Sequence, residues 1–184
     1  QAGTSSTWPR RARLAATAWQ ISADAKTFTF TLRRGVRFHA TPYFTPTRDL
    51  NADAVIFTFA RMTDAQHPFH RAYPVPYVYA QSLGLAEMIA GIDRIDEHTV
   101  RFRLKQANVA FLSYFSGAFA GIHSAEYAAK LLAEGRASAI NNQPVGSGRE
   151  GGEPLAAVDQ AGRGRAQAKV LAKGGEPALG VQTA

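Results

Sequence analysis

Four aromatic residues are the strongest candidates for a binding role in this sequence. Tyr73, Tyr77 and Tyr79 follow one another in a Pro-rich segment, and Phe119 comes further along the chain. Ligand cavities are commonly walled by aromatic side chains and need few charges, so these four could line such a cavity. The same residues could instead pack in the core, and the sequence leaves both roles open. They are the candidate ligand-binding residues.

Two histidines, His67 and His70, form the closest pair of potential metal ligands. Their spacing could place both on one metal ion only if a third ligand came from elsewhere. Asp64 is the one carboxylate nearby, and Pro68 disfavours a regular helix across the pair. We therefore expect two loop histidines, with no metal site and no cofactor.

Other polar residues could suggest catalysis, but each has a simpler interpretation. Asp93, Asp96 and Glu97 lie in and beside a turn, where solvated acids are common. Ser124 lacks the sequence context of a nucleophile and precedes a helix, which it can cap. The Gly-Ser-Gly turn at 146–148 lacks the lysine and helix of a phosphate loop. With no visible nucleophile, base and oxyanion donor, no catalytic residue is assigned and an enzyme is not expected.

Composition and charge exclude further kinds of site and function. The 184 residues carry a formal net charge of +7, but this charge is spread along the chain and no Lys/Arg cluster follows one helix. Binding to nucleic acid is therefore not expected. The absence of cysteine excludes disulfides and Cys-based metal sites. No apolar run is long enough to span a bilayer.

Two segments with alternating residue types predict the elements that position these side chains. In Thr27–Leu32 and Thr99–Leu104, apolar residues alternate with threonine or arginine, as in a strand with one buried face. The turn-forming residues 22–26 precede the first of these two segments. A third strand over 91–95 and the turn at 96–98 would form a hairpin with the second. The fold class is therefore α+β (α/β), a mainly antiparallel sheet with packed helices and one solvated face.

One helix is expected to cover the apolar face of this sheet. Asn51 or Asp53 would cap it, and it would run through Met62. A single stripe of apolar residues recurs at helical spacing in it: Val55, Ile56, Phe59 and Met62.

The remaining segments are less regular. Prolines make 63–78 a long irregular connection, and 119–122 is expected to be extended. The short apolar segment 110–115 is predicted to be a helix. A further helix would run from Ser124 through Leu132 and end at Gly135.

Three blocks of sequence carry a resemblance to a known family. LAATAWQISADAKTFTFTLRRGVRFH, FTPTRDLNADAVIFTFAR and NNQPVGSG occur in this order between Leu14 and Gly148. They resemble the extracytoplasmic solute-binding proteins of family 5, the dipeptide- and oligopeptide-binding components of ABC importers. The resemblance implies the extra small domain of a periplasmic-binding-protein type II-like fold. The family holds the charged ends of the peptide with residues beyond the matching region, so no charged anchor is assigned here.

The resemblance also implies a function. The chain would be a fragment of a substrate-binding protein that captures a di- or oligopeptide outside the cytoplasmic membrane and delivers it to an ABC transporter permease. It would act in the periplasm or at the cell surface, as a monomer, with the permease subunits as partners of the full-length parent. The alternative is a structural or interaction fragment with no ligand of its own. No signal peptide is visible at Gln1, so we expect it to have been removed or the start to be missing.

The resemblance and the composition together divide the chain into three parts. We expect an irregular segment over 1–13, a partial solute-binding domain over 14–148, and a disordered tail over 149–184. The tail has no Phe, Trp or Tyr and buries too little apolar surface to offset the entropy of ordering. The family continues after Gly148 with Pro-Phe or Pro-Tyr, whereas this chain has Arg149. A frameshift is the favoured explanation, and a natural tail is the alternative.

Overall fold

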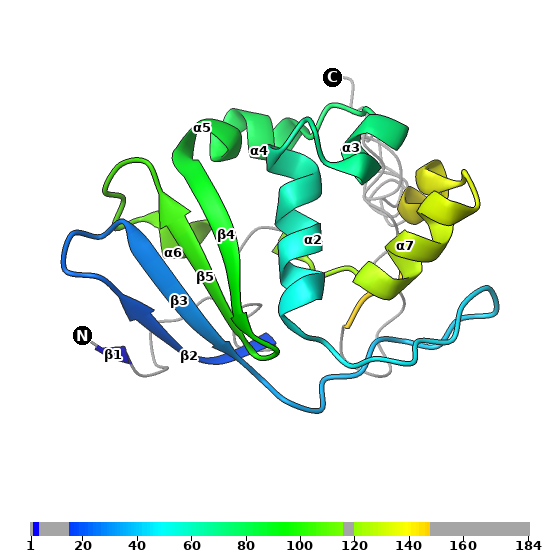
Figure 1. The fold of residues 1–184 in the computed structure, drawn as a ribbon, viewed down its shortest axis with the longest axis horizontal. Helices are drawn as coiled ribbons and strands as arrows, with labels where there is room; N and C mark the ends of the chain where they lie inside the picture. The colour runs from blue at the N-terminus through cyan, green and yellow to red at the C-terminus, as the bar shows by residue number, and fades with distance from the viewer. Residues whose placement is uncertain (1, 4–14, 116–119, 148–184) are drawn as a thin grey trace, which may run out of the picture.

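The computed structural model describes residues 2–3, 15–115 and 120–147. In this part of the chain an antiparallel five-stranded sheet with the order β1-β2-β3-β5-β4 forms one side of the molecule (Figure 1). The strands are β1 (Ala2–Gly3), β2 (Ala16–Ile21), β3 (Thr27–Leu32), β4 (Ile89–Asp96) and β5 (Thr99–Leu104).

The two strands with alternating sequence are neighbours in the centre of this sheet. Phe28 of β3 lies opposite Phe102 of β5, and Phe30 lies opposite Val100. All four side chains are buried, because the period of two puts them on the same face. The prediction of one antiparallel sheet with a buried apolar face is confirmed.

Polar turns join the strands as the sequence indicates. In the turn from β2 to β3, the Ser22 hydroxyl accepts a hydrogen bond from the backbone N–H of Thr27 at 2.9 Å. In the hairpin between β4 and β5, Asp96 accepts one from the N–H of His98 at 2.7 Å. The strand β2 was not among the predicted elements; its apolar residues follow no regular period, with only Ala16 and Trp19 buried.

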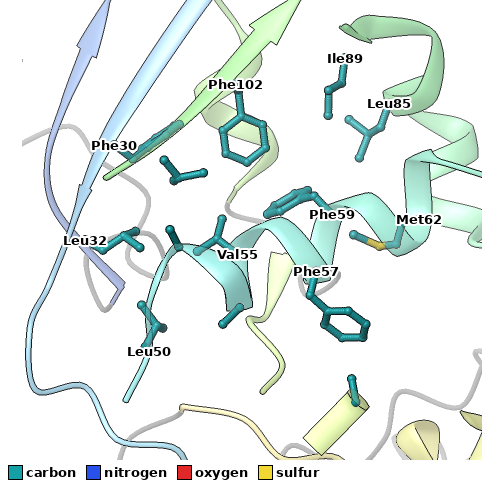
Figure 2. Packing of buried hydrophobic residues seen from close by; sticks show 14 of the residues in the cluster. Phe30, Leu32, Leu50, Val55, Phe57, Phe59, Met62, Leu85, Ile89 and Phe102 are labelled. Atoms are coloured by element: carbon teal, nitrogen blue, oxygen red, sulfur yellow. The ribbon is translucent and has the colours of Figure 1, made fainter. Parts of the chain in front are cut away.

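The helix α2 (Ala52–Thr63) lies between the sheet and α7 (Ala125–Ala133) (Figure 1). Of the two candidate caps, Asn51 is the N-cap and accepts a hydrogen bond from the N–H of Ala54 at 3.2 Å. Phe59 packs on the sheet, with its ring 5.2 Å from that of Phe102, whereas Phe57 points away from the sheet (Figure 2).

The prediction of a single apolar stripe on α2 therefore needs correction. Phe57 is buried against Phe69 of α3 (Pro68–Ala72), with 5.2 Å between the ring centroids. Ile56, assigned to the stripe, is only partly buried. Both faces of α2 are covered, because α3 and α7 pack on the side opposite the sheet.

The segment 63–78 is also more regular than predicted. His67 caps α3, and Pro68 occupies the first turn of this helix, where the missing N–H of proline removes no helical hydrogen bond. The short helices α4 (Val78–Ser82) and α5 (Leu85–Met88) follow. The expectation of loop histidines is wrong for His70, which lies within α3.

The second half of the chain agrees with the sequence more closely. α6 (Phe111–Tyr114) lies within the predicted 110–115, and Ser124 caps α7. Gly135 follows α7 with φ of +66°, a conformation that favours glycine. A 3-10 helix, η2 (Ala137–Asn141), comes next. The extended segment expected at 119–122 contains no strand in its described part, 120–122.

The three-part division of the chain stays a prediction. Residues 149–184 lie outside the described residues, as do 1 and 4–14. Ala2–Gly3 pairs with Trp19 and Gln20 as β1, so the segment expected to be irregular contains a short strand at these two positions. Within the part of the chain that the structure describes, no helix is long and apolar enough to cross a membrane.

Candidate functional site

The structure places three of the four candidate aromatics in one region. Tyr73 ends α3, Tyr77 precedes α4 and Tyr79 lies within α4. Tyr73 and Tyr77 are partly buried, and the Tyr73 hydroxyl accepts a hydrogen bond from Asn141 Nδ2 at 3.0 Å. Tyr79 is 60% exposed. Phe119 lies outside the described residues, so its role is untested.

Sequence reasoning missed a buried arginine in this region. Arg61, in the last turn of α2, is only 6% exposed. Its guanidinium carbon lies 5.8 Å from the centroid of the Phe57 ring and 5.5 Å from that of Tyr77. Cation–π attraction to these two rings offsets part of the cost of burying the charge. Burial nevertheless lowers the pKa of Arg61 from its ordinary value.

The position of Arg61 in the helix could have indicated its burial. Arg61 follows Phe57 by four residues and Thr58 by three, so the three side chains lie on one face of α2. Only one apolar stripe was predicted for this helix, so the burial of this second face was missed.

His123 extends this polar region toward α7. Its backbone N–H donates to Thr58 Oγ1 at 3.0 Å, and the Thr58 hydroxyl donates to the carbonyl of Ala54 at 2.8 Å. Burial, and then the positive charge of Arg61, lower the pKa of His123 to about 3. The imidazole is therefore neutral at physiological pH.

Arg61, Tyr77 and His123 together are called the Arg61 cluster below. Each has a buried polar atom without a hydrogen-bond partner among the described residues: Nε of Arg61, the hydroxyl of Tyr77 and Nδ1 of His123. Burial raises the pKa of Tyr77 although the charge of Arg61 opposes this, so the phenol stays protonated. The Tyr77 hydroxyl interacts with the Arg61 guanidinium, which opposes the lowering of the Arg61 pKa by burial, whereas Nε of Arg61 and Nδ1 of His123 keep unused hydrogen-bonding capacity within the described residues.

The histidine pair has local roles. His67 Nδ1 accepts a hydrogen bond from the N–H of Phe69 at 3.2 Å, and burial lowers the pKa of His67. His70 Nδ1 lies 2.9 Å from the carbonyl oxygen of Arg61 and donates to it when protonated there. No three potential metal ligands gather within the described residues.

The carboxylates of the β4–β5 hairpin form local contacts too. Asp93 Oδ2 lies 2.8 Å from Arg103 Nε and 3.0 Å from Arg101 Nε on the solvated face of the sheet. Hydrogen bonds from these arginines, that of Arg103 first, hold the pKa of Asp93 below its ordinary value. The Ser124 hydroxyl accepts from the N–H of Tyr127 at 3.2 Å and acts as a helix cap.

Comparison with known proteins assigns the class to which this fold belongs. Residues 11–149 match the family described as bacterial extracellular solute-binding proteins, family 5 Middle. The chain belongs to the bacterial extracellular solute-binding proteins of family 5. The resemblance noted in the sequence is thereby confirmed.

Individual relatives are similar over the same region. Di/tripeptide-binding protein 1 of Pseudomonas aeruginosa (strain UCBPP-PA14) is 52% identical over 133 residues, which are 72% of this chain and 25% of that protein. The chain thus spans about a quarter of the length of the curated relatives that it matches.

Two solved structures show the same fold. The dipeptide binding protein from Pseudoalteromonas sp. SM9913, in complex with Met-Leu, is 47% identical with a TM-score of 0.70, over 73% of this chain and 26% of that one. The periplasmic binding protein DppA from Helicobacter pylori, in complex with peptide STSA, is 33% identical with a TM-score of 0.68, over 73% and 26% of the two chains. Both likenesses support the predicted periplasmic-binding-protein fold.

Proposed function

We propose that this chain is part of a substrate-binding protein that captures di- or oligopeptides outside the cytoplasmic membrane and delivers them to an ABC transporter permease. The family match over residues 11–149 carries the proposal, because the family consists of extracellular solute-binding proteins. The names of similar proteins specify di- and tripeptides as the solutes that those proteins bind. We place the action of this protein in the periplasm or at the cell surface, as a monomer and without catalysis.

The candidate aromatics differ in how far their side chains are exposed to solvent. Tyr77 packs on His70, with 5.5 Å between the ring centroids, and Tyr73 is hydrogen-bonded to Asn141. Tyr79 is the most exposed of the three and is flanked by the exposed Val78. We propose Tyr79 as the first of these residues to contact a peptide, with Tyr73, Tyr77 and Phe119 completing the wall.

Calorimetric titration with a mixed set of di- and tripeptides tests the function. A longer parent protein that contains this sequence should bind clearly, and the chain of 184 residues weakly or not at all. One small domain offers only part of a cleft, and it cannot recover the cost of ordering the ligand. Micromolar or tighter binding by this chain alone would contradict the need for further domains. Absence of binding by the parent would favour the alternative, a fragment with no ligand.

Substitutions in the parent test the residue assignment. Tyr79→Ala should weaken peptide binding about tenfold, as loss of an aromatic anchor does. Ile95→Ala, at an exposed position near the end of β4, is the control and should leave affinity unchanged. Equal affinity of Tyr79→Ala and the unaltered parent would remove Tyr79 from the site.

A further inference from the structure

Arg61 carries a buried positive charge without a counter-charge. No carboxylate of the described residues forms an ion pair with it. Asp64, the carboxylate closest in sequence, is exposed and accepts a hydrogen bond from the N–H of Gln66 at 2.8 Å. Burial of a charge is costly unless it is paired and hydrogen-bonded; the Tyr77 hydroxyl interacts with the guanidinium but is neutral, and Nε has no hydrogen-bond partner among the described residues.

The other members of the Arg61 cluster supply hydrogen-bond donors but no negative charge. The Tyr77 phenol stays protonated because burial raises its pKa, and its O–H can donate. The His123 imidazole is neutral because burial and the charge of Arg61 lower its pKa to about 3, and it can carry its proton on Nδ1. The cluster therefore combines a net charge of +1 with donor groups on three side chains, and of these Arg61 Nε and His123 Nδ1 have no hydrogen-bond partner among the described residues.

The three residues come from separate parts of the chain. Arg61 is on α2, Tyr77 lies at the start of α4, and His123 precedes α7. The Arg61 guanidinium carbon lies 5.5 Å from the centroid of the Tyr77 ring, and the backbone N–H of His123 donates to Thr58, three residues before Arg61 on α2. A water molecule could accept hydrogen bonds there but would leave the charge uncompensated. A carboxylate supplies both the acceptor atoms and the charge, and guanidinium groups form strong charge-assisted hydrogen bonds with carboxylates.

We propose that the Arg61 cluster is a carboxylate-binding site, in which a small carboxylate accepts hydrogen bonds from Arg61 Nε, the Tyr77 hydroxyl and His123 Nδ1. The carboxylate can be a free anion such as formate, or an aspartate or glutamate side chain supplied by a longer parent protein. The site shares Tyr77 with the proposed peptide wall but differs from it in Arg61 and His123, and the residue proposed to contact a peptide first is the exposed Tyr79.

Thermal unfolding of this chain in formate tests the site. Formate replaces gluconate, a much larger carboxylate with a six-carbon chain, at constant ionic strength. We expect a saturable rise in Tm of about 5 °C at ten times the dissociation constant, because formate binds the folded state alone. In a ¹⁵N-labelled sample the Arg61 Nε–H resonance should shift with the same midpoint.

Three variants test whether the rise of Tm in formate arises from binding at the Arg61 cluster. Arg61→Met places an apolar chain of similar length in the buried position, which proteins often tolerate, and should abolish the response to formate. Tyr77→Phe removes one donor at almost constant volume and should weaken formate binding about threefold to tenfold. Arg34→Met, the same change at an exposed position, should leave the response intact. Equal Tm values in formate and gluconate, or a response retained by Arg61→Met, would overturn the proposal.

The parent protein distinguishes the two sources of the carboxylate. A formate response in the parent identifies a free anion. If formate has no effect on the parent but Arg61→Met lowers its Tm, the carboxylate comes from the longer chain. If formate has no effect and Arg61→Met leaves the Tm of the parent unchanged, no carboxylate occupies the cluster and the proposal is wrong.

Discussion

Single polar residues with one specific partner determine several local features of this structure. Ser124 is almost fully buried, and its hydroxyl satisfies an N–H in the first turn of α7 that has no partner within the helix. Thr58 is fully buried and bonds both to the carbonyl of Ala54 and to the N–H of His123. Removal of such a group leaves a buried donor or acceptor unpaired, so the cost exceeds that of an exposed hydrogen bond.

The cap of α7 gives the first prediction. Ser124→Ala should lower the free energy of unfolding by about 1 kcal/mol, since the cap is lost and nothing replaces it. Urea denaturation followed by circular dichroism measures this. Ser82→Ala, at an exposed position in α4, is the control and should change stability by less than about 0.5 kcal/mol. Equal stability of the two variants would contradict the role of Ser124 as the cap.

The Asp93 contacts give a prediction about pH. The pKa of Asp93 is lower in the folded state than the value of about 3.9 expected in the unfolded chain, so its ion pairs stabilise the fold above that pH. Because Arg101 and Arg103 are nearly half exposed, solvent screening reduces the effect, and Asp93→Asn should cost about 0.5 kcal/mol at pH 7.

This difference should disappear in acid. As the pH falls through the folded-state pKa, the carboxyl of the unaltered protein is protonated and loses the same contacts. Denaturation curves of the two proteins at pH 7 and in a series below pH 4 compare them directly. A difference in stability that persists unchanged throughout the acid series would refute the assignment of the effect to the ionised Asp93.

Among the described helices and strands, α2 is the element that is packed on two opposite sides. Six phenylalanine rings pack against one another between this helix, the sheet and α6: Phe28, Phe30, Phe59, Phe102, Phe111 and Phe115. On its other side α2 contacts α3 and α7 through Phe57 and Thr58. The helix therefore connects two halves of one core.

The two-sided burial of α2 gives the third prediction. Phe57→Ala and Phe59→Ala should each destabilise the protein by about 3 kcal/mol, because each leaves a cavity in a packed region. Ile56→Ala, at a partly exposed position of the same helix, should cost only about 1 kcal/mol. Chemical denaturation measures all three. If Phe57→Ala cost no more than Ile56→Ala, the side of α2 away from the sheet would not be part of the core.

At the scale of the whole molecule, the described residues share one hydrophobic core. Residues of the sheet, of α2 and of α7 belong to the same buried cluster, which extends as far as Val145 near the end of the described chain. A single cluster favours one cooperative unfolding transition. The region that matches the family, 11–149, covers this cluster.

The last prediction concerns residues 149–184, which lie outside the described residues. We propose from their lack of aromatic residues that they add nothing to the stability of the core. Deletion of 149–184 should leave the thermal transition unchanged, and brief trypsin treatment should cut after Arg149, Arg163 or Arg165 before it cuts in β5 at Arg101. Protection of the three sites comparable to that of Arg101, or a lower Tm after the deletion, would disprove this.

The sequence by itself determined the parts of the fold that depend on local patterns. The period of two in β3 and β5 specifies which side chains face the core, and Ser124 and Gly135 mark the ends of α7. The three sequence blocks were also sufficient to recognise the family, because matching motifs identify a family even where hydrophobic patterns do not specify the structure.

Only the tertiary structure decided the environment of α2 and of the candidate site. The burial of Phe57 and Arg61 depends on α3 and α7. α7 is distant from α2 in sequence, and α3 lies in a segment of irregular composition. The periodic pattern of apolar residues in α2 predicts only the face that packs on the sheet. The same holds for the aromatic candidates. Whether Tyr77 packs inward or Tyr79 remains exposed follows from the position of α4 against its neighbours, because residues two positions apart at the start of a helix point in different directions and residue type alone does not choose between them.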